Sequence, residues 1–391
     1  MNYILFDGTV RDALLPFTFT RPVAEIRIGI LTIREKWERH LGLTTTTLTE
    51  EYLSLKYPMV ELENNVMINA SFLPKNSLVE MVINLQKNQA IFKGDTLIAF
   101  YTNDSQEEVD FDTYEIIEYS EDCLTVENNW DIFSKNDSAL REDFELITED
   151  RTSESIPKSV NAIAPGNIFI EEGAKLEFVT LNASTGPIYI GKNSEIMEGS
   201  VIRGPFALCE FGKVKLATKV YGATTVGPHS VIGGEVNNSV LFGYSNKGHD
   251  GFLGNSVLGE WCNIGADSNN SNLKNNYEEV KLWSYETENF AKTGLQFCGL
   301  MMGDHSKCGI NTMFNTGTVV GVSANIFGAG FPRNFVPSYS WGGASGFSTY
   351  LTSKAFQTAK IVMARRNVEF TEDDATILEH VFDATKKYRK E

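Results

Sequence analysis

The sequence predicts a chain of three parts: an α/β domain over residues 1–155, a parallel β-helix over residues 156–346, and α-helices over residues 347–391. Three observations predict this fold class. Apolar runs with strand character alternate with helical spacing in the first part. A six-residue aliphatic period dominates the second part, and helical spacing returns in the third. At 391 residues the chain is also long for a single domain.

The first part has the pattern of a mixed α/β domain. Strand-like apolar runs occur at residues 3–6, 66–68 and 96–100, the last directly after a Lys-Gly-Asp turn sequence. Residues 26–41 have helical spacing of their apolar side chains, with charged residues between them. The polar stretch 149–158 ends in Pro-Lys and is typical of a linker.

A period of six residues runs through the second part. From Ile190, eight successive positions at this step are aliphatic: Ile190, Ile196, Ile202, Leu208, Val214, Val220, Val226 and Ile232. The frame then slips by two residues and continues with one polar member, at Val240, Asn246, Phe252, Leu258 and Ile264. A later block repeats the step at Met302, Cys308, Phe314, Val320 and Ile326.

This period fits neither an amphipathic helix nor an alternating strand. It is typical of a hexapeptide β-helix, in which three hexads make one triangular coil. Each aliphatic residue then points into the prism, glycine tolerates the tight corners, and stacked coils bury one continuous core. The period disappears between residues 267 and 296, where we expect an inserted loop that is either functional or disordered.

Two helices are predicted in the third part. One spans residues 351–366. The other begins after Thr371, an N-cap residue with Asp374 three positions on, and runs to about residue 387. We expect the helices to cap the open end of the β-helix, whose last coil would otherwise expose unpaired strand edges.

Composition and charge exclude several functions. The formal net charge of −17 argues against nucleic acids and anionic membranes as partners, because both need a basic surface, but a phosphate-bearing small molecule needs only a local positive pocket. No apolar run has the length of a membrane span, and the N-terminus lacks a secretory signal, so we predict a cytoplasmic protein. The five cysteines show no zinc spacing and are predicted to be reduced and mostly buried, and no metal site is predicted.

His249 is one of only five histidines and lies in a glycine-rich stretch, GYSNKGHDGFLGNSVLG. A histidine in such a corner is either a plain surface residue or, because imidazole titrates near neutral pH, a candidate base. His229 and His305 lie in similar corners and are expected to be structural or to line a substrate. His40 and His380 fall in helical patterns and are expected to be inert.

Two segments of the second part carry a family resemblance. KGHDGFLGNSVLGEWCNIGADS shares His249, Gly254, Gly259 and residues 263–266 with the pattern K-A-x-H-L-x-Y-x-G-D-x-x-I-G-x-x-x-N-I-G-A-G-T. TGLQFCGLMMGDHSKCGINTMFNTGTVVG contains the order G-D-H-x-x-x-G-I-N. Residues 225–326 thereby resemble the acetyltransferase domain of the bifunctional glucosamine-1-phosphate acetyltransferase/uridyltransferase family, and the second segment resembles its archaeal members.

The resemblance implies a left-handed β-helix, a homotrimer, and acetyl-CoA as co-substrate with its pantetheine arm in a groove beside the coils. It implies His249 as the catalytic base, which takes the proton of an attacking amine or hydroxyl. Asn263, Asn272 and Lys247 are the implied substrate-binding residues, and Ala266 matches a backbone position beside the acyl-CoA. Lys247 stands two residues before the histidine, whereas the bacterial lysine stands three before it.

Two departures from the family pattern concern the acceptor. Phe252 stands where the family has tyrosine, and residues 234–238 stand where it has paired lysines. The acceptor is therefore predicted by class, as a sugar phosphate or nucleotide sugar of the glucosamine-1-phosphate kind.

The opening segment ILFDGTVRDALLPFTFTRPVAEI follows part of the pattern L-A-G-G-x-G-T-R-L-x-P-L-T-x-x-x-P-K. Gly8 and Arg11 match its G-T-R, Val23 stands at its lysine, and Arg21 offers a cation from a shifted position. The first part thereby resembles a shortened sugar-1-phosphate nucleotidyltransferase domain. The resemblance implies nucleotide binding by Gly8, Arg11 and Arg21, with Mg²⁺ needed only if the domain is active; the alternative is a remnant that only packs against the β-helix.

The leading functional prediction is acetyl-CoA-dependent acyl transfer to a sugar phosphate or nucleotide sugar, in nucleotide-sugar or cell-envelope precursor synthesis. Nucleotidyl transfer by the first part is a predicted second activity. The competing prediction is a catalytically inactive trimeric scaffold or a regulator that binds nucleotide sugars.

Overall fold

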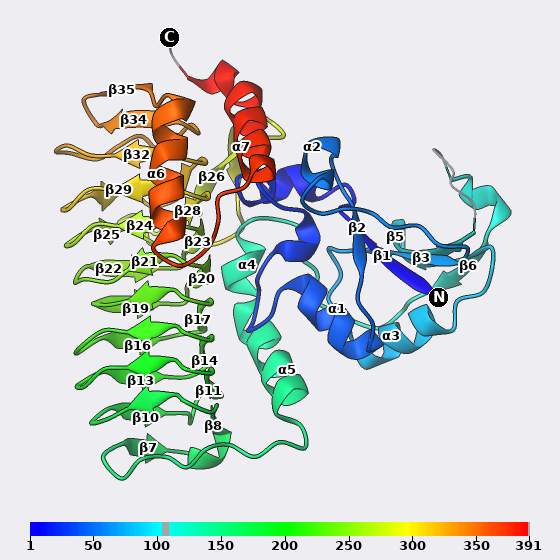
Figure 1. Cartoon of the computed structure of the whole chain (residues 1–391), viewed down its shortest axis with the longest axis horizontal. Coiled ribbons are helices and arrows are strands. Elements are labelled where there is room, and N and C mark those ends of the chain that lie inside the picture. The colour runs from blue at the N-terminus through cyan, green and yellow to red at the C-terminus, as the bar shows by residue number, and fades with distance from the viewer. Residues whose placement is uncertain (104–108, 390–391) are drawn as a thin grey trace.

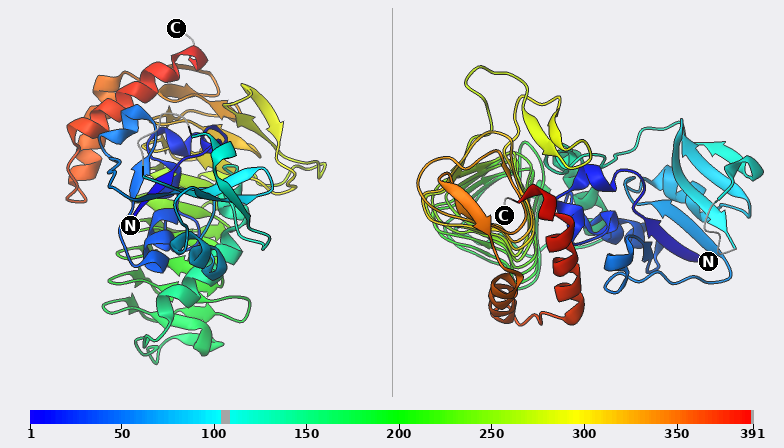
Figure 2. Two further views of the ribbon diagram at one scale, coloured as in Figure 1. Left: turned by 90° about the vertical axis from the view of Figure 1, so that its right-hand side faces the viewer. Right: turned by 90° about the horizontal axis from the view of Figure 1, so that it is seen from above.

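A computed structural model describes residues 1–103 and 109–389. It confirms the predicted fold class: a mixed α/β domain, a tall parallel β-helix and C-terminal helices (Figure 1). Seen from above, the β-helix has a roughly triangular section, and the α/β domain lies beside it (Figure 2).

The N-terminal domain is built on a six-stranded mixed sheet in the order β2-β1-β3-β5-β4-β6. β1 is parallel to β2 and β3, whereas β5 is antiparallel to β3 and β4. The strands are β1 Asn2–Phe6, β2 Thr46–Leu48, β3 Asn65–Asn69, β4 Gln89–Lys93, β5 Thr96–Thr102 and β6 Glu115–Glu118. The α-helices are α1 Ile33–Leu41, α2 Glu51–Ser54, α3 Asn76–Ile83, α4 Asp131–Ser134 and α5 Asn136–Thr148. The three predicted strands are confirmed.

The helix predicted over residues 26–41 begins only at Ile33, as α1. Thr32 Oγ1 accepts from the Glu35 N–H at 3.1 Å, and the Glu35 carboxylate accepts from the Thr32 N–H at 2.6 Å, so a capping box fixes the helix start here. Residues 26–32 form a loop instead, in which Gly29, at φ +74°, packs so closely on α5 that a Cβ would lie 2.7 Å from the Ala139 carbonyl. Tertiary packing thus overrides the helical spacing.

The β-helix has three faces, each a parallel sheet. The first face contains β7 Asn161–Ile163, β10 Thr180–Asn182, β13 Val201–Arg203, β16 Lys219–Tyr221, β19 Glu235–Asn237 and β22 Phe252–Gly254. The second contains β8 Ile168–Ile170, β11 Ile188–Ile190, β14 Phe206–Leu208, β17 Thr224–Val226, β20 Val240–Gly243, β23 Val257–Glu260, β28 Leu300–Met302, β31 Thr318–Val320 and β33 Phe335–Val336. The third contains β9 Lys175–Leu176, β12 Glu195–Ile196, β15 Lys213–Val214, β18 Val231–Ile232, β21 Asn246–Lys247, β24 Asn263–Ile264, β29 Lys307–Cys308, β32 Asn325–Ile326, β34 Ser340–Gly343 and the antiparallel β35 Gly346–Thr349. A separate pair joins β25 Asn269–Asn270 to β30 Met313–Phe314.

The predicted interior frame from Ile190 to Ile232 is confirmed. All eight aliphatic side chains are at most 2% exposed and belong to one core, which the later block from Met302 to Ile326 continues. Strands one coil apart pair at an offset of 18 residues, as Ile196 does with Val214. Three hexads therefore complete one coil.

The frame predicted after Ile232 is wrong by one residue on three strands. The interior positions are Leu241, Lys247 and Leu253, not Val240, Asn246 and Phe252. Ile232 pairs with Lys247, 15 residues on, because the corners of this coil are shorter than those below it. Leu258 and Ile264 return to the predicted frame.

Lys247 therefore places an ammonium group inside the β-helix. Its side chain is 1% exposed, and Nζ donates to the carbonyls of Gly233 at 3.0 Å and His249 at 2.5 Å. Burial lowers the pKa of Lys247 from its ordinary value of 10.5 to about 8. The two carbonyls follow strands one coil apart, so the lysine ties the turn that carries His249 to the coil below.

The second face of the β-helix carries the N-terminal domain. Val240, Phe242 and Val257 point outwards from this face and share one hydrophobic core with the α/β domain. Arg21, 5% exposed, is paired with the buried Asp304 of the β-helix. One continuous core and one buried ion pair thus join the two domains.

The insertion at residues 267–296 also packs at this junction. It forms a hairpin of β26 Lys281–Ser284 and β27 Asn289–Lys292. Val280 and Leu282 are buried in the core that the β-helix shares with the α/β domain. The part of the chain that lacks the hexapeptide period therefore has a packing role.

The C-terminal helices are α6 Thr352–Ala364 and α7 Glu372–Ala384, and the expected capping box of Thr371 and Asp374 is present. The expectation that they cap the β-helix is wrong. α6 lies along the third face, and α7 lies between the β-helix and the α/β domain (Figures 1 and 2). On the third face the strand of the last coil, β34, is covered by β35, which folds back on it.

Contacts of α7 reach both domains. Tyr339 Oη of the β-helix donates to the Leu378 carbonyl at 2.7 Å. On the other side, the ring of Tyr52 in α2 stacks on His380 with ring centroids 3.7 Å apart. His380, which the sequence left without a role, is therefore part of a domain contact.

Within residues 1–103 and 109–389, no helix is long and apolar enough to cross a bilayer. The cytoplasmic location stays a prediction. Four of the five cysteines are buried and Cys123 is half-buried, which confirms the predicted burial, and in the same residues the structure contains no disulfide.

The buried lysine makes stability depend on pH. Because its folded pKa lies below its unfolded pKa, the folded state is penalised while the amine is charged, and the penalty is relieved as pH rises above about 8. Relative to a Lys247→Met variant, the parent should gain about 2 kcal/mol of unfolding free energy between about pH 7 and pH 9.5. Urea unfolding at each pH measures this difference. Lys354→Met, at an exposed position, is the control, and a pH-independent difference for Lys247→Met would contradict the burial of a charged amine.

Candidate functional site

A groove of about 870 Å³ runs between the third face of the β-helix and α6. Three of the predicted site residues, His249, Asn263 and Ala266, line it together. Thr358 and Val362 of α6 form part of its wall. The other lining residues are Lys215, Val231, Asn246, Gly248, Trp261, Cys262, Ile264, Gly265, Lys307, Ile310, Arg365 and Arg366.

The strand register brings His249 and Ala266 to neighbouring coils. The N–H of Asp267 donates to the Asp250 carbonyl at 3.0 Å, so the turn of Ala266 lies directly above the turn of His249. His249 is exposed on its turn. In the described parts of the chain the Ala266 N–H has no hydrogen-bond acceptor, which leaves it available to a ligand oxygen.

Gly248 and Gly265 line the groove and belong to a column of glycines on the third face. Gly233, Gly248, Gly265 and Gly309 each follow a strand of the third face, on successive coils. A Cβ at Gly233 would lie 2.7 Å from the Gly248 carbonyl, so close stacking of the coils excludes a side chain there. At Gly248 a Cβ would meet only Val231, at 3.5 Å, so the space above Gly248 belongs to the groove. A ligand can therefore approach the backbone.

The groove is positively charged. Four cationic side chains line it, Lys215, Lys307, Arg365 and Arg366, and among the described residues no carboxylate does. Lys307 Nζ donates to the His305 carbonyl at 2.8 Å, and burial lowers the Lys307 pKa to about 8. In a chain of net charge −17, this is the local positive pocket that an anionic ligand needs.

Two predicted substrate-binding residues do not line the groove. Asn272 Nδ2 donates to Asn255 Oδ1 at 2.8 Å, beside β22 of the first face. Lys247 points into the β-helix and is 1% exposed, so its ammonium has no surface with which to contact a substrate.

The other two corner histidines belong to an aromatic stack. Phe211, His229, Tyr244 and Trp261 lie on successive coils with neighbouring ring centroids 4.2 to 4.8 Å apart. His305 continues the stack above Trp261 at 6.3 Å, and burial lowers its pKa to about 3. These contacts give both histidines a structural role.

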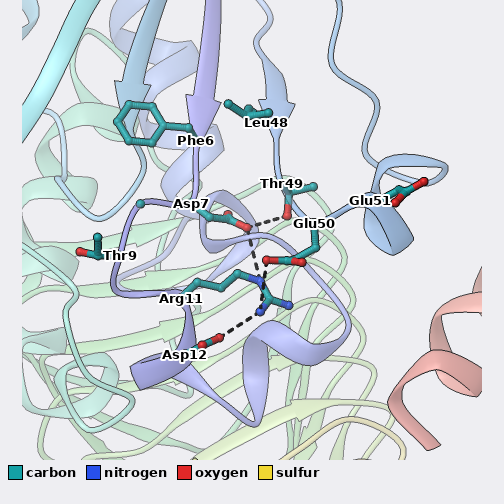
Figure 3. A pocket seen from close by; sticks show the side chains of 10 residues that line it. Phe6, Asp7, Thr9, Arg11, Asp12, Leu48, Thr49, Glu50 and Glu51 are labelled. Carbon is teal, nitrogen blue, oxygen red and sulfur yellow. Dashed lines mark hydrogen bonds and ion pairs between the residues drawn. The ribbon is translucent and has the colours of Figure 1, made fainter. Parts of the chain in front are cut away.

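A second cavity, of about 500 Å³, opens in the N-terminal domain at the carboxyl ends of β1 and β2 (Figure 3). This is the end of a parallel sheet where ligands usually bind. The predicted residues Gly8 and Arg11 both line it. Gly8 has φ +63°, and a Cβ there would lie 3.0 Å from Asn69 Oδ1, so glycine suits this turn. The remaining lining residues are Phe6, Asp7, Thr9, Asp12, Leu48, Thr49, Glu50 and Glu51.

Arg11 is engaged by its neighbours rather than free for a phosphate. Nη1 lies 3.1 Å from Asp12 Oδ1, and Nη2 donates to Tyr52 Oη at 2.6 Å and to the Thr18 carbonyl at 3.0 Å (Figure 3 shows the acidic side). Asp7 lies 3.6 Å from Nε, and burial raises the pKa of its carboxyl. The arginine therefore holds the loop that forms the cavity.

The carboxylates of this cavity do not fit a Mg²⁺ site. Asp7 accepts from the Val23 N–H at 2.7 Å and from Thr49 Oγ1 at 2.5 Å, besides facing Arg11. In the described residues no group of three or more histidine, cysteine or acidic side chains is arranged to hold a metal ion. Mg²⁺ requires nearly octahedral coordination by oxygen, and the most buried carboxylate of the cavity, Asp7, is already engaged by the Val23 N–H, Thr49 and Arg11.

Arg21 is absent from the lining of this cavity. Its guanidinium is buried at the domain junction, paired with Asp304 and 3.5 Å from Glu260. Its predicted role in nucleotide binding has no support from this position.

Comparison with known proteins agrees with a two-part chain. Residues 3–152 match the model of a family described as sugar nucleotidyl transferase. Two Escherichia coli proteins align with 144 residues at 24% identity: the uncharacterized acetyltransferase YaiX of strain 536 and its namesake in strain K12. The alignment covers 36% of this chain and 62% of each relative, so the chain spans less than two thirds of their length. The protein thus combines a nucleotidyltransferase-like domain with an acetyltransferase-like β-helix.

Sequence reasoning missed the cations of the groove. Arg365 and Arg366 end the apolar pattern of the last-but-one helix, and such a pair is ordinarily assigned to the helix C-terminus. Lys215 and Lys307 follow or begin strands of the hexapeptide pattern, where an outward side chain is unremarkable. The two adjacent arginines were the one sequence signal for a basic site. Their role can be inferred only when the position of α6 beside the third face is known.

Proposed function

We propose that the protein transfers an acyl group from an acyl-CoA, with acetyl-CoA as the first candidate, to an amino or hydroxyl group of a sugar phosphate or nucleotide sugar. The observation that carries the proposal is one groove that combines His249, Asn263 and Ala266 with four cations and no lining carboxylate among the described residues. Both substrates carry phosphate, and a basic groove attracts both.

His249 would act as general base. Its imidazole takes the proton of the acceptor amine or hydroxyl while the nitrogen or oxygen attacks the thioester carbonyl carbon. The carbonyl oxygen becomes an oxyanion, for which the unpaired Ala266 N–H is a donor. The carbon–sulfur bond then breaks, and the imidazolium returns the proton to the departing thiolate. Asn263 would orient the acceptor.

The acyl-transfer proposal is tested by thiol release from acetyl-CoA with a panel of amino-sugar phosphates and nucleotide sugars. His249→Ala should lower the rate about 10²- to 10⁴-fold, because it removes the base. His229→Ala is the matched control, since His229 is stacked between Phe211 and Tyr244 outside the groove lining. If no acceptor gives turnover, or if both variants behave alike, the inactive scaffold or regulator becomes the better assignment.

We also propose a second activity, nucleotidyl transfer in the N-terminal domain, which rests on the family match over residues 3–152 and on the position of the cavity at the ends of β1 and β2, and not on the charge of the cavity. We expect labelled pyrophosphate to exchange into a nucleoside triphosphate in the presence of a nucleotide sugar. Arg11→Gln should abolish exchange by collapsing the loop of the cavity, whereas Arg141→Gln, an exposed position on α5, should not. Absence of exchange with each of several nucleotides would leave this domain a packing remnant.

We also propose a homotrimer. The second face is covered by the α/β domain and part of the third by α6, whereas the first face exposes Ile163, Val201 and Tyr221. Sedimentation velocity should give a trimer for the parent chain and a smaller species for Val201→Glu, because a buried charge opposes association. A parent chain that sediments as a monomer contradicts the proposal.

A further inference from the structure

The cations of the groove differ from several buried or half-buried cations elsewhere in the molecule. Arg11, Arg21 and Lys36 are paired with carboxylates, and Lys247 donates to two backbone carbonyls. In the described residues, Lys215, Arg365 and Arg366 make no ion pair. The guanidinium of Arg366 has one long hydrogen bond, from Nη2 to Asn246 Oδ1 at 3.4 Å. The donors of these three side chains are therefore open to solvent or to a ligand, and Arg365 is exposed.

Their positions surround the glycine column. Arg366 contacts Asn246, which precedes His249 on the same coil, so α6 places its arginines at the level of the candidate base. Lys215 follows β15, and Gly233 and Gly248 follow the next two strands of the third face. With coils spaced about 4.8 Å apart, the lysine lies roughly 10 Å below Gly248.

A structural role at the helix end does not account for this charge. The C-terminus of α6 carries a partial negative charge of about half a unit, which one arginine would balance. The groove contains two arginines and two lysines without a lining carboxylate among the described residues. The surplus positive charge remains for a ligand.

We propose that Arg365 and Arg366, together with Lys215, bind a phosphate monoester of a substrate in the groove. Planar guanidinium groups match phosphate oxygens in pairs, and the lysine adds a point charge from below. The arginines at the end of α6 would thus supply the positive charge that is missing at residues 234–238, which stand where the resembling family has paired lysines. The identity of the substrates rests on the proposed acyl transfer. The phosphate is either that of the sugar-phosphate acceptor or the 3′-phosphate of CoA, and both have the same chemistry.

The test is calorimetric titration of the full chain at fixed ionic strength with two pairs of probes. Glucosamine 1-phosphate is compared with glucosamine, and CoA with 3′-dephospho-CoA. The Arg365→Gln/Arg366→Gln variant should bind one of the two phosphate-monoester probes at least about tenfold more weakly and leave binding of its counterpart without that monoester unchanged. Lys354→Gln/Lys360→Gln removes the same charge from exposed positions of α6 outside the groove lining and should change affinity less than about twofold.

The probe that loses affinity identifies the source of the phosphate. Loss for glucosamine 1-phosphate assigns the site to the acceptor, and loss for CoA but not 3′-dephospho-CoA assigns it to the donor. Equal weakening by both double variants, no effect of the arginine variant, or no binding of either probe to the parent chain overturns the proposal. The titration measures binding without turnover. A parent chain that binds the probes but releases no thiol from acetyl-CoA therefore contradicts the acyl-transfer assignment and not the phosphate site.

Discussion

Each interior side chain of the β-helix packs on the side chain one coil below, and the backbone hydrogen bonds between coils fix that contact in register. Because the interior side chains fix the register of neighbouring coils, the outward-facing residues of those coils are aligned as well. The glycine column from Gly233 to Gly309, the neighbouring turns of His249 and Ala266, and the aromatic stack that ends at His305 are outer consequences of one inner constraint. The shape of the groove therefore depends on the fixed register between neighbouring coils.

The same constraint explains what could be predicted from the sequence. The interior from Ile190 to Ile232 was predictable residue by residue, because equal corners keep the aliphatic side chains six residues apart. The prediction failed where corners shorten, and there the interior position is Lys247, a residue that no hydrophobic frame selects. A single sequence contains no signal for a corner that loses residues when the next inward side chain is polar.

The candidate site was predictable where it depends on local turns. His249, Asn263 and Ala266 come together because they lie on neighbouring coils. The positions of α6 and of Arg21 depend instead on which surface a helix or loop packs against, and amphipathic spacing does not identify that surface. Arg21 illustrates this limit: its place in a nucleotide-binding pattern predicted a phosphate ligand, and the fold gives it Asp304.

The two cavities carry opposite charge. The N-terminal cavity has four lining carboxylates against Arg11, whereas the groove has four cations and none of its lining residues in the described ranges is acidic. An anionic ligand is repelled by the first and attracted by the second. The electrostatics therefore favour the β-helix as the place where phosphate-bearing substrates act.

The position of α6 has a consequence for truncated chains. α6 and the two arginines that follow it form one wall of the groove, whereas the residues that line the N-terminal cavity all lie between Phe6 and Glu51. A chain cut before α6 would stack its coils and keep the N-terminal cavity but would lack this wall, so truncated copies would not compete with the full chain for the substrates of the groove.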